Sequence, residues 1–588
     1  MNCTARAARN IRWNAMLFET FRRNLYERPD EAAFLIAAGD RSLPISWRQF
    51  ADDISALALI IRKKSPGAVI GILGENSYEW ITAHAACLFS GACAVPVDVN
   101  LSAEEIAERL IRTGAGVLVH SSLYDEKACR VQGLIPGLTV AGFGTMKTDV
   151  VLNLARKALA EGEKGIFELS APDTGKTSMI MFTSGTTSEP RGVELTIEGI
   201  ELFCRNVHDR IPMRAGERSL MLLPLQHIFG ICAAYAMLSA GIALGVCPDY
   251  RRLYDAAVRF HADFVFLVPA LADILVSKIE RHRNPDGAPA CRLKWVCIGG
   301  APLSFRTQER LSTLGVKVLT AYGLTETTAL YSLSDYSREN PPGCAGEVCA
   351  LSGVETAVSP EGQLMIRGDN VFKGYYRDPE RTAAAKDRDG WFHTGDIGRI
   401  DADGRVWITG RASRTIVLSS GKKVAPEELE AKILLYPGIN EVVVSGDGAE
   451  REIVAEIYSR LPEGEVHNII TTLNLSLPVY MRIKRVVCRK SPFPRTASGK
   501  IAIPRDSVAK PRRRWSPLLG LSAVGLIAAI ALVLGLVPDI MTLDDSPSGG
   551  WRQVLDIGEV SGEIILEILM FVLIFNAWRK VRGNRRGR

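Results

Sequence analysis

Short apolar runs alternate with helical patterns along the first part of the chain, from about residue 18 to residue 123. Residues 68–73 and 94–97 have the composition of buried strands, whereas 80–90 and 103–113 have the pattern of helices. Two parallel strands must be joined by a crossover, which is usually a helix, so this alternation favours parallel strands with helices on both faces. The sequence therefore predicts an α/β fold built on doubly wound, parallel-type sheets.

The pattern changes twice further along the chain, whose 588 residues suggest two to four domains. Residues 346–410 contain short strands and turns, such as GQLMIRG, GWFHTGDIGRI and GRVWITG, which predict a small β-subdomain. Strand and helix patterns then alternate again up to about residue 508, with strands expected at 441–445 and 453–459. This last stretch is predicted to form a small α+β domain.

The net charge of +6 is unevenly distributed. Residues 510–588 hold eleven basic and seven acidic residues, which leaves +2 for the rest of the chain and argues against a nucleic-acid surface there. The twelve cysteines form no C-x-x-C pair, so neither a zinc site nor a disulfide framework is expected, and a reducing cytosol fits. The first sixteen residues have no apolar core, so we do not expect a cleaved signal peptide.

Residues 181–193, MFTSGTTSEPRGV, pass from the end of a predicted strand at 178–182 into small and hydroxyl-bearing residues. Such a loop can present backbone N–H and hydroxyl donors to a polyphosphate, although its composition also fits a solvated turn. It is not a Walker loop, because no Gly-Lys-Ser/Thr follows Gly185. The Gly-Lys-Thr at 175–177 fails too, since Ser170 stands where that motif needs its first glycine.

Residues 220–247 are largely apolar and uncharged, so hydropathy alone would make them a membrane span. Pro, Gln and His at 224–227 and the breaks at Gly230 and Gly241 favour a buried segment of the protein body instead. A lone histidine such as His227 is more often a core residue than a functional one.

Two further apolar strands end in loops, which is where ligands bind in open α/β sheets. Residues 295–298 lead into GGAPL, and residues 316–320 lead into AYGLTETT. Without further information the first loop is a turn, and the second is the start of a polar helix capped by threonine.

The C-terminal part is predicted to form a membrane hairpin with helices at about 516–537 and 559–578. Residues 518–537 carry no charge, and Trp515 lies where an aromatic anchor belongs. Basic residues flank both outer ends and the connection is mostly acidic, which places both ends in the cytoplasm. The second helix contains Glu563 and Glu567, so it either spans the membrane or lies at its interface.

Six motifs, in order along the chain, resemble those of the adenylate-forming superfamily, which includes acyl-CoA synthetases, adenylation domains and luciferases. They are TSGTTSEPRG from 183, LPLQHIFG from 223, YGLTETT from 322, GWFHTGD from 390, GRASRTIVLSSGKKVAPEELE from 410 and PRTASGKI from 494. Looser likeness extends back to Gly74. The first motif departs from the usual pattern at Ser188 and Arg191, and the fifth departs at Ser413, Arg414 and Val417.

The resemblance implies a division into three parts. Residues 1–409 would form a large AMP-binding domain with its β-subdomain, and 410–509 a small mobile domain that carries the catalytic lysine. Residues 510–588 would anchor the protein in a membrane, expected to be a bacterial inner membrane, with the catalytic domains in the cytoplasm. The anchor is not part of the superfamily pattern.

The resemblance also assigns roles to individual residues. Lys500, Glu326 and Thr183 would be catalytic, and Glu326 and Thr183 would hold Mg²⁺. Tyr322 would stack on adenine, Thr325 would bind the α-phosphate, and Asp396 and Arg411 would bind the ribose. The full ATP site would comprise Thr183, Ser184, Gly185, Thr186, Thr187, Arg191, Tyr322, Gly323, Thr325, Asp396 and Arg411. The acyl pocket would comprise His227, Phe229, Gly230, Gly299, Gly300 and Ala301.

The reaction implied is that of an AMP-forming acid–thiol ligase, with ATP, Mg²⁺ and coenzyme A as reactants and cofactors. Amino-acid adenylation domains usually carry an Asp shortly after the position of His227, and this chain has none there. The apolar pocket and the anchor favour a medium- or long-chain fatty acid. The alternatives are transfer to the phosphopantetheine of an acyl carrier protein, activation of an aryl acid, and a non-catalytic membrane scaffold.

Overall fold

The structure is a computed structural model in which the chain divides into two compact units, residues 1–509 and 510–588. It describes residues 16–39, 41–64, 67–143, 156–157, 159–162, 164–183, 190–282, 291, 293–447, 452–494 and 501. All described residues belong to the first unit. The predicted membrane hairpin lies outside them.

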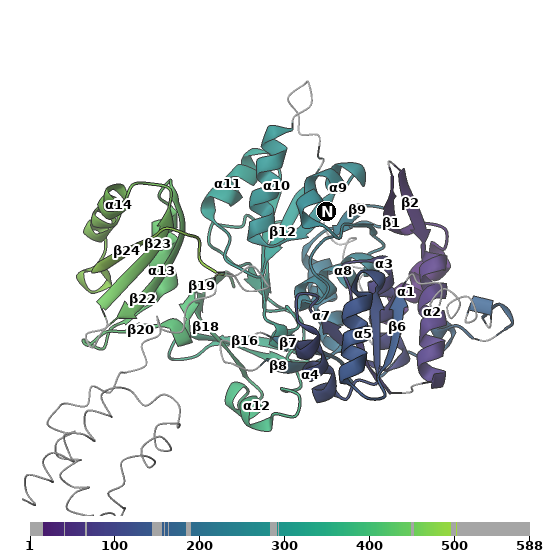
Figure 1. Ribbon diagram of the computed structural model, residues 1–588. Coiled ribbons are helices and arrows are strands. Elements are labelled where there is room, and N and C mark those ends of the chain that lie inside the picture. Colours follow the sequence, from purple (N-terminus) through teal and green to yellow (C-terminus); the bar gives the residue numbers. More distant parts are fainter. Residues whose placement is uncertain are drawn as a thin grey trace, which may run out of the picture. The chain divides into compact units, whose positions relative to one another are not determined.

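The first of the sheets has six strands in the order β6-β5-β3-β4-β7-β8 (Figure 1). Its strands are β3 Val69–Leu73, β4 Cys93–Val97, β5 Val117–Ser121, β6 Thr139–Phe143, β7 Thr177–Thr183 and β8 Arg191–Thr196. The helices between and beside them are α2 Trp47–Lys64, α3 Tyr78–Ser90, α4 Ala103–Thr113, α5 Asp125–Leu134 and α7 Ile197–Arg210, with 3₁₀ turns η1 Ser122–Tyr124 and η2 Ile166–Glu168.

Both faces of this sheet are covered by apolar side chains, as the alternation in the sequence predicts. Along β3, Ile70 and Ile72 enter the main hydrophobic core together with residues of α3. Leu73 points to the other face and packs in a second core with residues of α4 such as Ile106 and Leu110. The period of two along a strand is what sends neighbouring residues to opposite layers.

A second sheet, with the order β2-β1-β10-β9, packs into the same main core. Its strands are β1 Ala32–Ala38, β2 Arg41–Ser46, β9 Arg218–Met221 and β10 Ala243–Val246, with α1 Met16–Glu27 and α8 Ile228–Ser239 as neighbouring helices. The apolar stretch 220–247 thus forms the end of β9, then α8, then β10. The 12 residues of α8 are too few to cross a membrane, and they contribute to the core as the interrupted pattern predicts.

A third sheet, β11-β12-β13-β14-β15, carries the two strands that end in candidate loops. Its elements are η3 Tyr250–Arg252, α9 Leu253–Arg259, β11 Phe264–Leu267, α10 Pro269–Arg281, β12 Trp295–Gly299, α11 Phe305–Thr313, β13 Lys317–Tyr322, η4 Thr325–Thr327, β14 Ser332–Leu333 and β15 Glu347–Val348. β11, β12 and β13 are parallel, whereas β14 and β15 join antiparallel.

The predicted α/β class is confirmed, but the sheets are mixed and not purely parallel. β8 returns antiparallel to β7, with Thr183 opposite Arg191, and β2 is antiparallel to β1. A tight reversal between adjacent strands needs no helix, so short hairpins can end a parallel sheet. The strand and helix patterns in the sequence gave no direction for these edge strands.

The stretch from 346 to 410 forms an antiparallel sheet, as expected from its turns. It contains β16 Val354–Val358, β17 Gln363–Gly368, β18 Phe392–Ile400 and β19 Val406–Arg411, and α12 Pro379–Ala385 lies between β17 and β18 in the chain. β18 pairs with β19 so that Asp396 lies opposite Arg411. This pairing brings together two residues predicted for the ribose.

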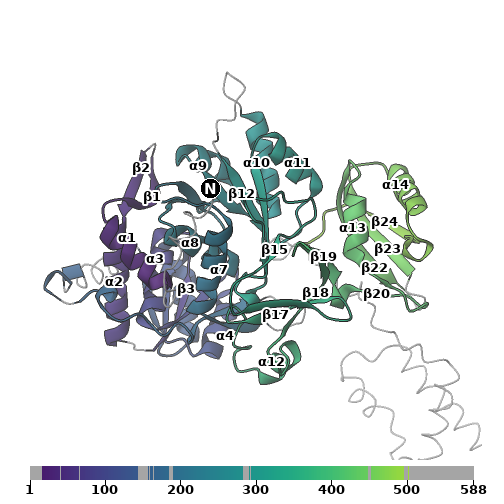
Figure 2. The ribbon, with the colours of Figure 1, turned by 180° about the vertical axis from the view of Figure 1, so that it is seen from behind.

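Residues after 411 form a separate group of strands and helices (Figure 2), which has a small hydrophobic core of its own. Its elements are η5 Ala412–Arg414, β20 Ile416–Val417, β21 Lys423–Val424, α13 Pro426–Leu434, β22 Ile439–Asp447, β23 Glu452–Ser459, α14 Glu463–Ser476, η6 Val479–Met481 and β24 Arg485–Arg489. β22 and β23 contain the strands expected at 441–445 and 453–459. The boundary at 409/410 remains a prediction.

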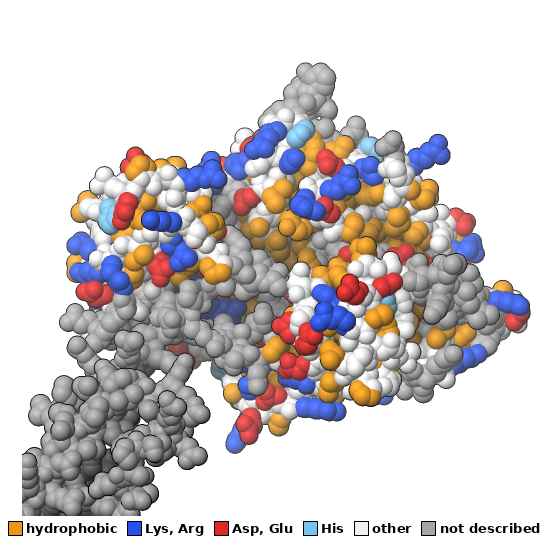
Figure 3. Space-filling view, in the orientation of Figure 1, with side chains coloured by type: hydrophobic (Ala, Val, Ile, Leu, Met, Phe, Trp, Pro, Cys, Tyr) orange, Lys and Arg blue, Asp and Glu red, His pale blue; other side chains and the backbone are white. Residues whose placement is uncertain are grey.

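Within the described ranges, no helix is long and apolar enough to span a membrane. The described cysteines are free thiols, and most are buried. On the face drawn in Figure 3, basic and acidic side chains are interspersed over the described surface.

Candidate functional site

The stem of the TSGTTSEPRG loop is an antiparallel hairpin. Thr183 ends β7 and Arg191 begins β8, and the two residues are paired across the ladder. A cation lies against this stem: the guanidinium of Arg112 is 5.4 Å from the ring centre of Phe182. The predicted residues Ser184, Gly185, Thr186 and Thr187, and also Ser188, lie outside the described residues. Thr183 and Arg191 therefore define where this loop begins and ends.

Glu326, predicted to bind Mg²⁺, lies close to this stem. Its Oε1 accepts a hydrogen bond of 3.0 Å from the hydroxyl of Tyr375. The guanidinium of Arg191 lies 5.4 Å from the centre of the same ring. Burial and the charge of Glu326 raise the pKa of Tyr375, so the phenol stays protonated and donates at neutral pH.

Tyr322, Asp396 and Arg411 form a second cluster. The Tyr322 hydroxyl donates to Asp396 Oδ2 at 2.5 Å, and Arg411 Nε lies 2.8 Å from Asp396 Oδ1. Asp396 is only 4% exposed, whereas the Arg411 side chain is 44% exposed. Burial and the neighbouring Asp396 raise the pKa of Tyr322 well above its usual value, which keeps it a donor. The buried carboxylate is thus held in one orientation by two donors.

The YGLTETT segment folds as a single 3₁₀ turn, so the helix that threonine capping alone would predict does not form. Gly323 lies against the backbone of Ala329, and a Cβ at position 323 would be 2.2 Å from the Ala329 carbonyl. Thr328 and Ala329 both have positive φ, at 49° and 58°. This tight reversal turns the chain back onto β14 and leaves Thr325 and Glu326 on the turn between two paired strands.

The residues predicted for the acyl pocket come from α8 and from the end of β12. Phe229 and Gly299 are in contact, since a Cβ at position 299 would lie 3.1 Å from the Phe229 ring and 3.0 Å from the Ala321 carbonyl. Gly300 has a φ of +82°, which favours glycine there, and Ala301 follows it. Gly299 thus touches both α8 and the strand that leads to Tyr322.

An apolar cavity of about 10 Å³, no larger than a water molecule, lies beside Gly230. Its walls are Leu220, Met221, Leu222, Leu223, Gly230, Ala233, Ala234, Met237 and Phe266. A Cβ on Gly230 would be 2.4 Å from the Pro224 carbonyl, so the helix start packs directly on the LPLQH segment. His227 is the residue before the first turn of α8.

Asn76 is a positioning residue that the sequence did not single out. Its amide donates to the carbonyls of Leu222 and Leu223 at 3.0 and 2.8 Å, and its Oδ1 accepts from Leu225 N–H at 3.0 Å. One buried side chain thereby fixes the segment before His227. Only its place in the phrase GENSYEW, which resembles the superfamily, could have drawn notice to it.

Arg414, where the superfamily pattern has an acid, is held by two acids of α13. Its guanidinium donates to Glu427 Oε1 at 2.9 Å and to Glu430 Oε1 at 2.6 Å, and also to the Val444 carbonyl at 3.2 Å. Ser413 lies beside it in η5 and Val417 in β20. The reversed charge of Arg414 is therefore compensated locally, and it joins the segment after β19 to α13 and β22.

The donor set present fits Mg²⁺ with a polyphosphate. Glu326 offers a carboxylate and Thr183 a hydroxyl, both hard oxygen ligands of the type that Mg²⁺ takes together with phosphate oxygens. Tyr375 donates a hydrogen bond to one carboxylate oxygen of Glu326, and the other oxygen of Glu326 is a candidate ligand of Mg²⁺. Lys500 lies outside the described residues, so its predicted place in the site stays a prediction, as do the roles assigned to the other residues.

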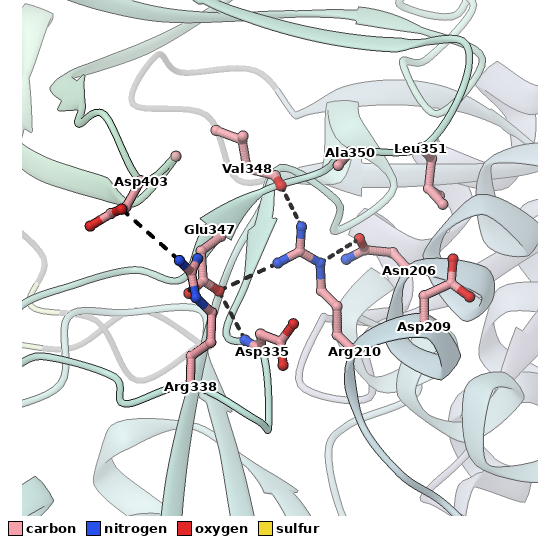
Figure 4. Close-up of a pocket in the computed structure, with 11 residues that line it drawn as sticks. Asn206, Asp209, Arg210, Asp335, Arg338, Glu347, Val348, Ala350, Leu351 and Asp403 are labelled. Carbon is pink, nitrogen blue, oxygen red and sulfur yellow. Dashed lines mark hydrogen bonds and ion pairs between the residues drawn. The ribbon is translucent and has the colours of Figure 1, made fainter. Parts of the chain in front are cut away.

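A cavity of about 350 Å³ in the described part is distinct from this site (Figure 4). Charged side chains from the end of α7 and from the β14–β15 and β18–β19 regions line it, and none of the described residues predicted for the site is among them. Arg210 crosses it to donate to the Val348 and Leu333 carbonyls at 2.6 and 3.0 Å and to Glu347 at 3.4 Å. These bonds tie α7 to β14 and β15.

Residues 21–376 match the family described as AMP-binding enzyme. The match spans more than half of the chain and covers β7, β8 and the YGLTETT turn, and Asp396 and Arg411 follow it. The chain therefore belongs to the AMP-binding enzyme family, the adenylate-forming superfamily that its motifs resemble.

Individual relatives are similar over most of the chain. A long-chain-fatty-acid–CoA ligase, FadD15 of Mycobacterium bovis, is 28% identical over 67% of this chain and 73% of its own length. An oxalate–CoA ligase of Arabidopsis thaliana is also 28% identical, over 74% of this chain and 87% of its own. The structure of O-succinylbenzoate coenzyme A synthetase from Bacillus subtilis with ATP and magnesium ion superposes with a TM-score of 0.67 at 22% identity, covering 82% and 98% of the two chains.

The expected enzyme class is confirmed: the chain is an AMP-forming acid–CoA ligase of the acyl-CoA synthetase type. ATP, Mg²⁺ and coenzyme A are the reactants and the metal of this class. Since the relatives are named for acids as different as long-chain fatty acids and oxalate, class membership leaves the acid open.

Proposed function

We propose that the protein activates a medium- or long-chain fatty acid with ATP and transfers the acyl group to coenzyme A. The apolar surroundings of Gly230 are the observation that supports a fatty acid as the substrate. No charged side chain is among the residues that line the neighbouring cavity, and the turn of α8 that begins at Ile228 is apolar or glycine. A small dianionic acid, or an amino acid with its ammonium group, would lose hydration there without gaining a partner.

The chemistry of the first step is the attack of the carboxylate on the α-phosphorus of ATP, which gives acyl-AMP and releases pyrophosphate. Both reactants are anionic, so cations placed near the negative charge that develops in the transition state contribute most of the rate acceleration. We assign this role to Lys500, and Glu326 and Thr183 would hold an Mg²⁺ ion that would supply further positive charge. Asp396 and Arg411 hold the ribose, and Tyr322 packs against the adenine. The coenzyme A thiol then attacks the acyl carbonyl and AMP leaves.

The test is carboxylate-dependent exchange of labelled pyrophosphate into ATP over a panel of fatty, aryl and amino acids and oxalate. Exchange should be fastest with fatty acids, and Lys500→Ala should reduce it strongly. A preference for aryl acids or oxalate would refute the choice of substrate. No exchange with any acid in the panel would instead favour a non-catalytic scaffold.

Adding coenzyme A or an acyl carrier protein to the same reaction identifies the acceptor. We expect AMP release and a thioester with coenzyme A. A thioester formed only with the carrier protein would overturn this part of the proposal and support the phosphopantetheine alternative.

We also propose that residues 510–588 tether the enzyme to the cytosolic face of a membrane, since residues 518–537 are uncharged and flanked by basic residues. Reconstitution into vesicles followed by flotation tests this proposal, with alkaline carbonate and high-salt washes to remove proteins bound only at the surface. The full chain should float after both washes, and a chain that ends at residue 509 should not. Release of the full chain by either wash would contradict a spanning anchor.

A further inference from the structure

We propose that Tyr375 is a positioning residue that orients the Glu326 carboxylate for the divalent cation bound with ATP. This inference rests on the proposed function, in which Glu326 is a ligand of Mg²⁺. Tyr375 lies within residues 346–410, which the sequence connects only with a small β-subdomain. Its hydroxyl donates to Glu326 Oε1 at 3.0 Å across 49 residues of chain.

The phenol of Tyr375 is itself held firmly. The residue is 7% exposed, and its ring packs edge-on against Phe372, with ring centres 4.9 Å apart. Its backbone bridges to Val193 of β8, and its N–H donates to Thr382 Oγ1 at 2.9 Å. Because backbone and ring are both fixed, the hydroxyl oxygen occupies one place and can impose one orientation on the carboxylate.

The same short segment also holds the backbone of Glu326. Phe372 N–H donates to the Glu326 carbonyl at 2.8 Å. Glu194 N–H donates to the Gly374 carbonyl at 3.0 Å, and Tyr376 N–H donates to Gly192 at 2.7 Å. Residues 372–376 therefore connect β8, the strand that follows the TSGTTSEPRG loop, to the turn that carries Glu326.

Arg191 contributes to this arrangement from the stem of the loop. Its guanidinium lies over the Tyr375 ring at 5.4 Å, where a planar cation can stack on an aromatic face. The Arg in place of the usual Lys of the motif thus has a structural consequence. A lysine would reach the ring only as a point charge and would lack the flat surface.

The physical effect is one of preorganisation. With Oε1 engaged by the phenol, the carboxylate loses rotational freedom before the cation arrives, and its other oxygen is available for coordination. Loss of such a hydrogen bond behind a metal ligand typically costs about 10- to 100-fold in metal affinity. The expected effect of Tyr375→Phe is therefore about a 10-fold weaker binding of the cation in the nucleotide complex.

The experiment measures Mn²⁺ binding to the full chain by electron paramagnetic resonance, in the presence of the non-reacting analogue α,β-methylene-ATP. Tyr375→Phe keeps the ring and removes only the hydroxyl. Tyr376→Phe is the matched control, because the hydroxyl of Tyr376 donates to the Thr113 carbonyl at 3.3 Å and not to Glu326. We expect the Mn²⁺ dissociation constant to rise about 10-fold in the first variant and to stay unchanged in the control.

A double-mutant cycle separates this inference from the proposed function. Glu326→Gln should weaken Mn²⁺ binding, and Tyr375→Phe should add nothing further in that background. If Glu326→Gln leaves Mn²⁺ binding unchanged, the metal role of Glu326 in the proposed function fails. If Glu326→Gln weakens binding but Tyr375→Phe alone does not, the positioning role of Tyr375 is refuted.

The thermal unfolding midpoint of each variant shows whether it folds. If Tyr375→Phe does not fold, Tyr375→Leu takes its place in the cycle, since it also removes the hydroxyl that donates to Glu326. Additive effects of the Tyr375 and Glu326 substitutions on Mn²⁺ affinity would mean that the two residues act independently, which would overturn the proposal.

Discussion

Replacing Gly323 by Ala tests whether the YGLTETT turn is as tightly packed as the structure shows. The new Cβ would lie 2.2 Å from both the carbonyl carbon and the oxygen of Ala329, and 2.7 Å from Leu330 N. All three atoms belong to the backbone, so no side chain can rotate away. The turn itself must open by about 1 Å to restore ordinary contact distances.

The cost follows from two opposing effects. Overpacking of this kind destabilises a protein by about 1–3 kcal/mol, while Ala in place of Gly lowers the entropy of the unfolded chain and returns about 0.4–1 kcal/mol. The net effect on the free energy of unfolding is a loss of about 1–2 kcal/mol. Because Tyr322 and Glu326 flank the turn, a shift of about 1 Å should slow pyrophosphate exchange about 100-fold.

Gly133→Ala in α5 is the matched control. Gly133 is exposed, and a Cβ there would have no atom within 4 Å, so the same chemical change should leave stability equal or higher and exchange unchanged. Thermal unfolding and pyrophosphate exchange of both variants are the measurements. A Gly323→Ala protein with the midpoint and exchange rate of the control would refute the reasoning from contact distances.

Two further predictions concern buried charge. Glu201 is 7% exposed, and burial raises the pKa of its carboxyl group to about 7, so the folded state favours the protonated form. The stability that this raised pKa contributes is fully present below about pH 4.5, and it is lost as the pH rises to about 7. The loss in the free energy of unfolding is about 3 kcal/mol. Glu201→Gln should remove this part of the pH dependence, measured by urea unfolding at a series of pH values. If the free energy of unfolding of Glu201→Gln depends on pH as steeply as that of the unaltered protein, this prediction is wrong. Arg414→Met should leave Glu427 and Glu430 without their shared cation and destabilise the small core by about 3 kcal/mol, whereas Lys432→Met, in an exposed pair on the same helix, should cost less than 1 kcal/mol. Equal midpoints for these two variants would show that the Arg414 cluster contributes nothing.

The sequence predicted those features that depend on neighbours along the chain. The strand at 68–73 and the helix at 103–113 agree with β3 and α4, because hydrophobic periodicity and caps such as Ser102 with Glu105 act over a few residues. The motifs were local as well, so the family could be recognised before any strand was paired. Even the false membrane span at 220–247 was resolved by the polar and glycine residues within it.

Only the tertiary structure decided which distant residues meet. Asp396 bonds Tyr322 across 74 residues, and Tyr375 bonds Glu326 across 49. The partners of Arg414 and the antiparallel return of β8 were likewise invisible in the sequence. The physical reason is that hydrogen bonds and packing between distant segments depend on sheet order and register, which are set by burial over the whole domain, whereas strand and helix formation is favoured by patterns that span a single element.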